Sequence, residues 1–215
     1  MITFPPHAPR QSPAGPPDGL PAPGRFAHLH PDDGACLMES AALLAGGGFT
    51  DSPAGTHPAL AALARVVNDS VGDATRHALW PLAAELADAR PVDRAYAPLL
   101  VGTVVDAARV LRRPSRRLAW HDRACRRRGE RLAHARAGGL PGRVADLLWW
   151  RGPGRRYLEH ALRVLCAAPD ADQRLAALLR KAVAEARDDT GRGGAGRDGA
   201  VGDGRVPAGE GRCNR

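Results

Sequence analysis

Residues 36–69, CLMESAALLAGGGFTDSPAGTHPALAALARVVND, form the stretch that best predicts the fold class. Apolar side chains recur in it every three or four residues, in two segments separated by three glycines and a proline. This spacing is typical of one helix face, and glycine and proline interrupt helices, so the stretch predicts two helices joined by a loop. The two stripes comprise Cys36, Leu37, Ser40, Leu43 and Leu44, and then Leu60, Leu63, Ala64 and Val67.

Polar residues at the ends of these segments predict how the helices begin and stop. Asp33 is expected to cap the first helix and Thr56 the second, with Pro58 just inside the second helix, where a missing N–H is tolerated. We expect Asn68 to end the second helix in a left-handed conformation and Asp73 to cap the third.

The rest of the chain also shows helical spacing. The third helix is predicted to reach residue 86 with a kink at Pro81, and a fourth follows Pro91 with Leu99 on its inward face. After Pro114 an arginine-rich helix and three further helices are predicted. The expected fold is therefore all-α, a single helical domain arranged as a bundle or orthogonal array of about six to eight helices.

The two ends of the chain differ in composition from this middle. Residues 1–27 are crowded with proline and glycine, and residues 188–215 are glycine-rich with mixed charge. Such segments bury too little apolar surface to offset their ordering entropy, so both are predicted to be disordered tails. This leaves a helical domain over residues 28–187, in which residues 91–187 form an arginine-rich half and residues 28–90 the half that contains the opening stretch.

Charge is distributed unevenly along the chain. Residues 109–163 carry sixteen arginines and four carboxylates, a net +12, which leaves −4 for the remainder of a chain whose total is +8. A basic half attached to an acidic one predicts an anionic partner, either a nucleic acid or an acidic protein. The expected partner-binding residues are Arg112, Arg113, Arg116, Arg117, Arg126, Arg127 and Arg128.

Aromatic residues lie among these arginines. Trp120 falls within the basic helix, and Trp149, Trp150 and Tyr157 follow it. Arginine for phosphate and aromatic rings for base stacking are typical of nucleic-acid binding, although Trp149 and Trp150 stand beside two leucines as core residues would. The alternative is a solvated arginine face that reflects codon preference, because Lys181 is the only lysine beside thirty arginines.

A second candidate site lies in the opening stretch. Glu39 is the only charged residue between Asp33 and Asp51. If both faces of its helix are covered, Glu39 is buried and needs a partner, for which Arg65 and His57 are the nearest candidates. Glu39, Asp51 and His57 are thus candidate catalytic or ligand-anchoring residues of a hydrolase type, whereas the alternative is a structural ion pair and ordinary helix capping.

The string HLHPDD, residues 28–33, resembles the metal-binding runs of metallo-β-lactamase-like hydrolases and of sugar deacetylases. Both families place that run at the end of a buried strand, and here a proline-rich segment precedes it. No phosphate-binding loop or nucleophile elbow is found either, so we expect no metal and no cofactor.

Cysteine spacing and hydropathy indicate the redox state of the thiols and the location of the protein in the cell. Cys36, Cys125, Cys166 and Cys213 are widely scattered, which favours free, buried thiols over a zinc site or a disulfide framework. The chain has no secretory signal pattern and no apolar run long enough to span a bilayer, so we expect a cytoplasmic protein without a membrane partner.

Within residues 33–90, the segments CLMESAALLAG, FTDSP, HPALAALARVVND and ALWPL resemble, in this order, a protein family of unknown activity found in actinobacteria and their phages. The resemblance covers about a quarter of the chain and implies no catalytic residues. The family often has Glu-Pro where Gly47 and Gly48 stand, histidine at Ser52 and cysteine at Gly55, so a family metal site at those positions would be missing here.

Taken together, these features predict a non-catalytic helical module that binds an anionic partner through its arginine-rich face. An enzyme or small-ligand site around Glu39, Asp51 and His57 is the first alternative. A structural or accessory protein, in which the opening stretch is only a packing unit, is the second.

Overall fold

The computed structural model describes residues 20–135 and 139–198, and these residues form helices and no strand. The predicted all-α fold is confirmed. In chain order the helices are η1 (Pro31–Asp33), α1 (Leu37–Leu44), α2 (Pro58–Ser70), α3 (Asp73–Leu79), α4 (Leu82–Leu86), α5 (Tyr96–Leu111), α6 (Arg116–Ala133), α7 (Leu140–Trp149), the π-helical turn η2 (Trp150–Gly154), α8 (Arg155–Cys166) and α9 (Ala171–Asp198).

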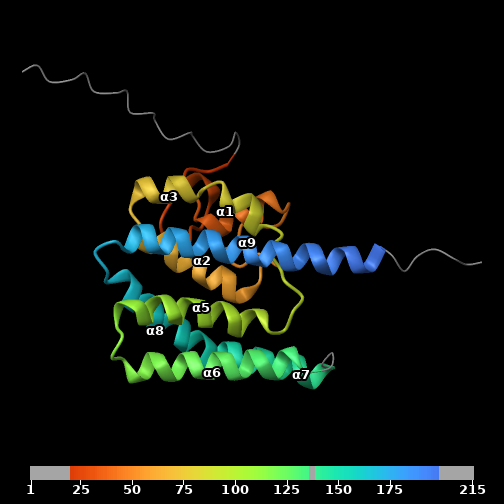
Figure 1. Cartoon of the computed structure of the whole chain (residues 1–215). Coiled ribbons are helices and arrows are strands. Elements are labelled where there is room, and N and C mark those ends of the chain that lie inside the picture. Colours follow the sequence, from red (N-terminus) through yellow and green to blue (C-terminus); the bar gives the residue numbers. More distant parts are fainter. Residues whose placement is uncertain (1–19, 136–138, 199–215) are drawn as a thin grey trace, which may run out of the picture.

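The helices pack in two groups that share one core. In Figure 1, α1, α2 and α3 lie in the upper part and α5, α6 and α7 in the lower part, while the long α9 crosses in front of α2. Helix α9 packs against α2, α3 and α4 as well as α5 and α8, so the C-terminal helix returns to the N-terminal half. A continuous cluster of buried side chains from Ala35 to Ala186 therefore unites both halves of the sequence in one domain.

Helix α1 begins later than its predicted cap. Its N-cap is Cys36, whose sulfur accepts the N–H of Glu39, and the Glu39 carboxylate accepts the N–H of Cys36 in return. Asp33 lies in η1 instead, so the prediction that Asp33 caps this helix is wrong. The reciprocal pair satisfies two N–H groups that a helix start leaves open, which a single distant aspartate does not achieve.

Helix α1 ends at the predicted glycines. Gly46 has a φ of 70°, and the N–H groups of Gly46 and Gly47 donate to the carbonyls of Leu43 and Ala42. This arrangement is a Schellman motif, which favours glycine because a side chain is strained at positive φ.

Helix α2 starts and stops differently from the prediction. His57 is its N-cap and accepts the N–H of Ala59, whereas the hydroxyl of Thr56 donates to the carbonyl of Leu86. Asn68 does not end the helix, because α2 continues to Ser70 and Asn68 is buried inside it. The side chains of Thr56 and Asn68 both form hydrogen bonds with segments remote in sequence. These bonds outweigh the local preference of the two residues for helix ends.

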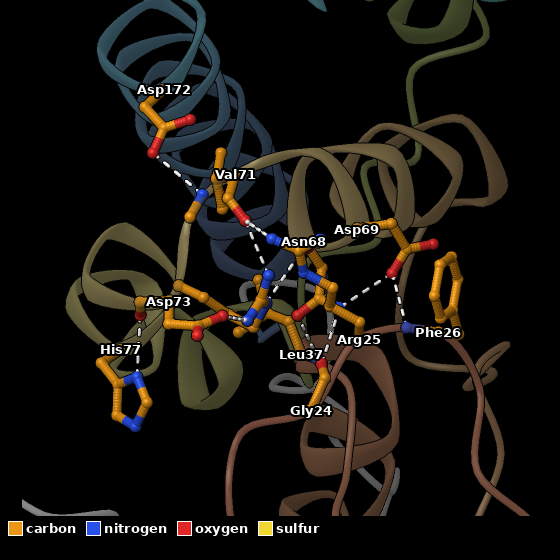
Figure 2. Close-up of polar contacts among 12 residues, drawn as sticks. Gly24, Arg25, Phe26, Leu37, Asn68, Asp69, Val71, Asp73, His77 and Asp172 are labelled. Atoms are coloured by element: carbon orange, nitrogen blue, oxygen red, sulfur yellow. Dashed lines mark hydrogen bonds and ion pairs between the residues drawn. The ribbon is translucent and has the colours of Figure 1, made fainter.

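The side chains of Asn68, labelled in Figure 2, and of Arg76 organise the turn between α2 and α3. The Asn68 side chain accepts the N–H of Leu37 and donates to the carbonyl of Gly24. Arg76, only 3% exposed, donates to the carbonyls of Asn68 and Val71 and to the carboxylate of Asp73. A buried guanidinium is tolerated here because its N–H groups have partners.

The structure also bears on the predictions for the start of α3, for Pro81 and for the inward face of α5. Gly72, not Asp73, is the N-cap of α3, and its N–H donates to Asp172 at the start of α9. The predicted kink at Pro81 separates α3 from α4. On α5, Leu99 is 56% exposed rather than inward-facing, while Leu100 is buried.

The ordered domain starts before the predicted boundary at residue 28. The N–H of Gly24 donates to the carbonyl of Ala35, and the N–H of Ala35 donates to the carbonyl of Ala22. The N–H of Phe26 donates to Asp69 (Figure 2). At the other end, α9 continues past the predicted boundary at residue 187 to Asp198. The remainder of both predicted disordered tails, residues 1–19 and 199–215, lies outside the described residues.

The thiols divide by environment. Cys36 and Cys125 are buried and free, as predicted, but Cys166 at the end of α8 is exposed. Cys213 lies outside the described residues. Within the part of the chain that the structure describes, no helix is long and apolar enough to cross a membrane.

Candidate functional site

Glu39 is buried at 1% exposure and is fully engaged by its neighbours. Its carboxylate accepts the N–H groups of His28 and Cys36, each at 2.7 Å, and lies 3.0 Å from Nδ1 of the His28 ring. Burial raises the pKa of Glu39, but the hydrogen bonds from Cys36 and His28 outweigh it and lower the pKa below its usual value. The expected partners Arg65 and His57 are therefore wrong, and His28 takes that place.

Asp51 and His57 have environments of their own. Asp51 accepts the hydroxyl of Ser52 and lies 3.6 Å from the guanidinium of Arg65. His57 caps α2 and makes an edge contact with the ring of Tyr96, with 4.8 Å between ring centroids. Among the described residues, no hydrogen bond or ion pair joins any two of Glu39, Asp51 and His57. Their contacts give no support to a single catalytic site.

The HLHPDD string does not converge on a metal. His28 contacts Glu39, while Asp32 and Asp33 form the short turn η1. Over residues 20–135 and 139–198, no group of three or more histidine, cysteine or carboxylate side chains is placed to bind an ion.

The seven arginines of the expected binding face divide into two sets, and the first is held by carboxylates. Arg126 donates to Asp122 and to Asp106, each at 2.8 Å. Arg128 donates to Asp146 at 2.6 Å, and its guanidinium lies over the ring of Trp149, 5.1 Å from the ring centroid. These two arginines hold α6 against α5 and α7, and their charge is largely neutralised within the fold.

The second set is exposed: Arg112, Arg113, Arg116, Arg117 and Arg127. Within the described part of the chain, none of these five forms an ion pair. Four of them flank Ser115, the N-cap of α6, whose first turn contains no acidic residue. Cations at a helix N-terminus oppose the helix dipole, so this corner is electrostatically unsatisfied and favours an incoming anion.

An aromatic cluster lies on α6 and α8 next to this corner. Trp120 is 53% exposed, and its ring meets Tyr157 edge-on with 5.4 Å between centroids. His121 stacks on Tyr157 at a centroid distance of 4.2 Å, and its Nδ1 lies 3.5 Å from Nδ1 of His160. We call the exposed corner and this cluster together the arginine–aromatic surface: Arg112, Arg113, Arg116, Arg117, Trp120, His121, Tyr157 and His160. His121 and Tyr157, at 4% and 9% exposure, are its buried members.

Electrostatics link the two parts of this surface. Burial lowers the pKa of His160, and the nearby charges of Arg117, Arg163 and Arg112 lower it further. Burial, followed by His160 and Arg117, lowers the pKa of His121 to about 4. Both rings are therefore neutral at pH 7, and a bound anion would offset the arginine charges and raise both pKa values.

The sequence did not single out His121 and His160 as site residues. Two sequence features could have indicated this cluster. Trp120 and His121 are adjacent, and Tyr157 and His160 are three residues apart, on one helix face. Their meeting depends on the packing of α6 against α8, which no local pattern specifies. Trp149 and Trp150, in contrast, are partly buried against the core, as their leucine neighbours indicated.

Chemically, the arginine–aromatic surface offers guanidinium groups for phosphates and an exposed indole on which a base can stack. It offers no activated nucleophile. No protein-family model, curated protein or solved structure matches the chain. The resemblance of residues 33–90 to the actinobacterial and phage family therefore stays a prediction.

Proposed function

We propose that this protein is a non-catalytic module that binds single-stranded nucleic acid through the arginine–aromatic surface. The observation that carries the proposal is the position of the half-exposed Trp120 beside arginines that have no ion-pair partner within the described residues. Phosphates would lie against Arg112, Arg113, Arg116 and Arg117, and a base would stack on Trp120.

The choice of a single strand follows from the aromatic ring. In a duplex the bases are stacked on one another, so an exposed indole on a convex helix face gains little from them. An unpaired base presents its face, and stacking on an aromatic side chain contributes about 1–3 kcal/mol per base. Phosphate contacts and stacking on an aromatic ring tolerate any base, so we expect little sequence preference.

An acidic protein is the competing partner. It would use the same arginines but has no need of Trp120 as a platform, and carboxylates do not stack. If codon preference alone explains the arginines, all exposed arginines should contribute equally to the binding of an anion. Arg126 and Arg128 are held by carboxylates, whereas the four arginines around Ser115 form no ion pair among the described residues, so the charge of this corner is open to a partner.

The test is fluorescence polarisation with a labelled single-stranded oligonucleotide, the same sequence as a duplex, and poly-glutamate as an acidic competitor, at about 50 mM salt. We expect micromolar binding of the single strand and a loss of about tenfold in Trp120→Ala. Phe26→Ala is the matched control, because Phe26 is also an exposed aromatic, at 65% exposure, and lies on the opposite half of the fold.

Equal affinity for the duplex, or equally strong competition by poly-glutamate, would contradict the proposal for a single strand. The same holds if Trp120→Ala and Phe26→Ala bind alike while circular dichroism shows that both are folded.

A further inference from the structure

A hollow of about 490 Å³ lies away from the arginine–aromatic surface, between the start of α2, the segment before α5, and α7. His57, Arg90, Arg94, Arg143, Leu147 and Trp150 are among its lining residues. Its volume falls within the range of about 300–1,000 Å³ that is typical of small-molecule sites.

The three arginines of this hollow differ in how they are held. Arg94 donates to Asp146 at 2.6 Å and to the carbonyl of Gly142 at 3.2 Å, so it is fixed as part of the wall. Arg90 is exposed and donates to the carbonyl of Ala54. Arg143 is exposed and has no ion pair among the described residues. Arg90 and Arg143 therefore retain N–H groups for a ligand.

The carboxylates at the hollow are already engaged. Asp146 is shared between Arg94 and Arg128, and Asp93 accepts the N–H of Ala95 at 2.8 Å. Asp93 keeps its negative charge, because a backbone N–H does not neutralise a carboxylate. Three arginines against two aspartates leave the lining with one net positive charge, which favours an anion.

His57 adds a neutral donor to the lining. Its Nδ1 accepts the N–H of Ala59 at 3.1 Å, so in the neutral ring the proton is on Nε2. Burial, and then the charge of Arg90, lower the pKa of His57 to about 4, which keeps the ring neutral at pH 7. A ligand group next to Nε2–H must accept a hydrogen bond.

The remaining wall is apolar. Val92 and Leu147 are 60% and 44% exposed, and Trp150 is partly buried against the core. Exposed aliphatic side chains beside an indole provide a surface for an apolar ligand body, while the arginines fix its charged end.

We propose that this hollow binds a small anion with an apolar body, a carboxylate or a phosphate ester, whose charged group contacts Arg90 and Arg143. This site is independent of the proposed nucleic-acid binding, because the two share no residue. Loss of either function leaves the other intact.

The test is saturation-transfer NMR on the full chain with three probes, benzoate, phenyl phosphate and benzyl alcohol, and with inorganic phosphate as a competitor. We expect ring-proton transfer to benzoate or phenyl phosphate at about millimolar concentration, and little transfer to benzyl alcohol. Comparison of benzoate with phenyl phosphate distinguishes the two anion chemistries. Competition by inorganic phosphate alone would show how much of the affinity comes from charge.

Matched variants locate the site. Arg143→Glu and Arg90→Glu should each weaken binding at least about tenfold, since each removes a charge-assisted contact. Arg151→Glu is the control, because Arg151 is also exposed but does not line the hollow, and the substitution changes the net charge by the same amount. Val92→Trp should fill the hollow and abolish binding without reversing a charge.

The proposal would be overturned by no transfer to either aromatic anion, by equal transfer to benzyl alcohol, or by equal weakening in Arg151→Glu and Arg143→Glu. Persistence of binding in a folded Val92→Trp variant would also show that the anions bind elsewhere.

Discussion

Replacing Glu39 with glutamine tests whether the buried carboxylate is a structural residue. The carboxylate accepts two backbone N–H groups, from His28 and Cys36, and contacts the His28 ring. A glutamine of the same shape has one carbonyl oxygen, so it can accept only one of the two N–H groups at full strength. Its NH₂ group then faces the second N–H, and that donor stays buried and unsatisfied.

The magnitude follows from these contacts. An unsatisfied buried donor costs about 1–3 kcal/mol, and the hydrogen bond that remains loses its charge assistance. We therefore expect Glu39→Gln to lower the free energy of unfolding by about 2–4 kcal/mol, out of a total that is typically about 5–15 kcal/mol.

Urea unfolding followed by circular dichroism measures this loss, and we expect the midpoint to fall by about 1 M or more with an unchanged slope. Asp33→Asn is the matched control, because it makes the same acid-to-amide change at an exposed residue of η1 and should stay within about 0.5 kcal/mol of the parent. A similarly small effect for Glu39→Gln would refute the structural role and return attention to a catalytic carboxylate.

Two further predictions concern pH and packing. The folded pKa of about 4 for both His57 and His121 lies below the unfolded value of about 6.5, so the unfolded chain binds more protons and stability falls as pH drops from 6.5 towards 4. Between pH 7 and pH 5, urea unfolding should show that the free energy of unfolding falls by up to about 2 kcal/mol per histidine. His121→Phe should make this fall smaller. An equally large fall in His121→Phe would contradict the lowered pKa of His121. Gly55→Ala should unfold the protein at lower urea by about 2 kcal/mol or more, because a Cβ there meets the carbonyl of Ala87, and a neutral effect would contradict this close approach.

The presence of the helices could be predicted from the sequence because periodicity is a local property, whereas their ends could not. Cys36 caps α1 because its side chain and that of Glu39, three residues later, each accept the other's backbone N–H. The Glu39 carboxylate also accepts the N–H of His28 from the preceding segment. Asn68 stays inside α2 because Leu37 and Gly24 engage its side chain. The start of α1 thus rests on a local pair that the sequence analysis did not recognise, whereas the partners of Asn68 are distant in sequence and no local preference includes them.

The same distinction applies to the candidate surface. The excess of arginine was visible in the sequence, but the division of arginines into paired and exposed sets was not. Asp146 on α7 neutralises Arg128, and Asp106 on α5 neutralises Arg126. The pairing of His121 with His160 likewise needs α6 and α8 to meet. Charge composition therefore indicates the class of partner that we propose, and packing determines which arginines stay exposed and without an ion pair among the described residues.

The salt dependence of single-strand binding tests whether the exposed arginines contact phosphates. Each phosphate contact in a single strand contributes about −0.7 to the slope of log affinity against log salt. Four contacts, from Arg112, Arg113, Arg116 and Arg117, predict a slope of about −2.8, which is a loss of about fiftyfold between 50 and 200 mM salt.

The decisive comparison uses two adjacent cation pairs. Arg116→Gln with Arg117→Gln should reduce the slope to about −1.4, because it removes two contacts at the α6 corner. Arg180→Gln with Lys181→Gln removes the same charge from an exposed pair on α9 and should leave the slope unchanged. Equal slopes for the two double variants would contradict phosphate binding at the arginine–aromatic surface, since binding would then depend on net charge alone.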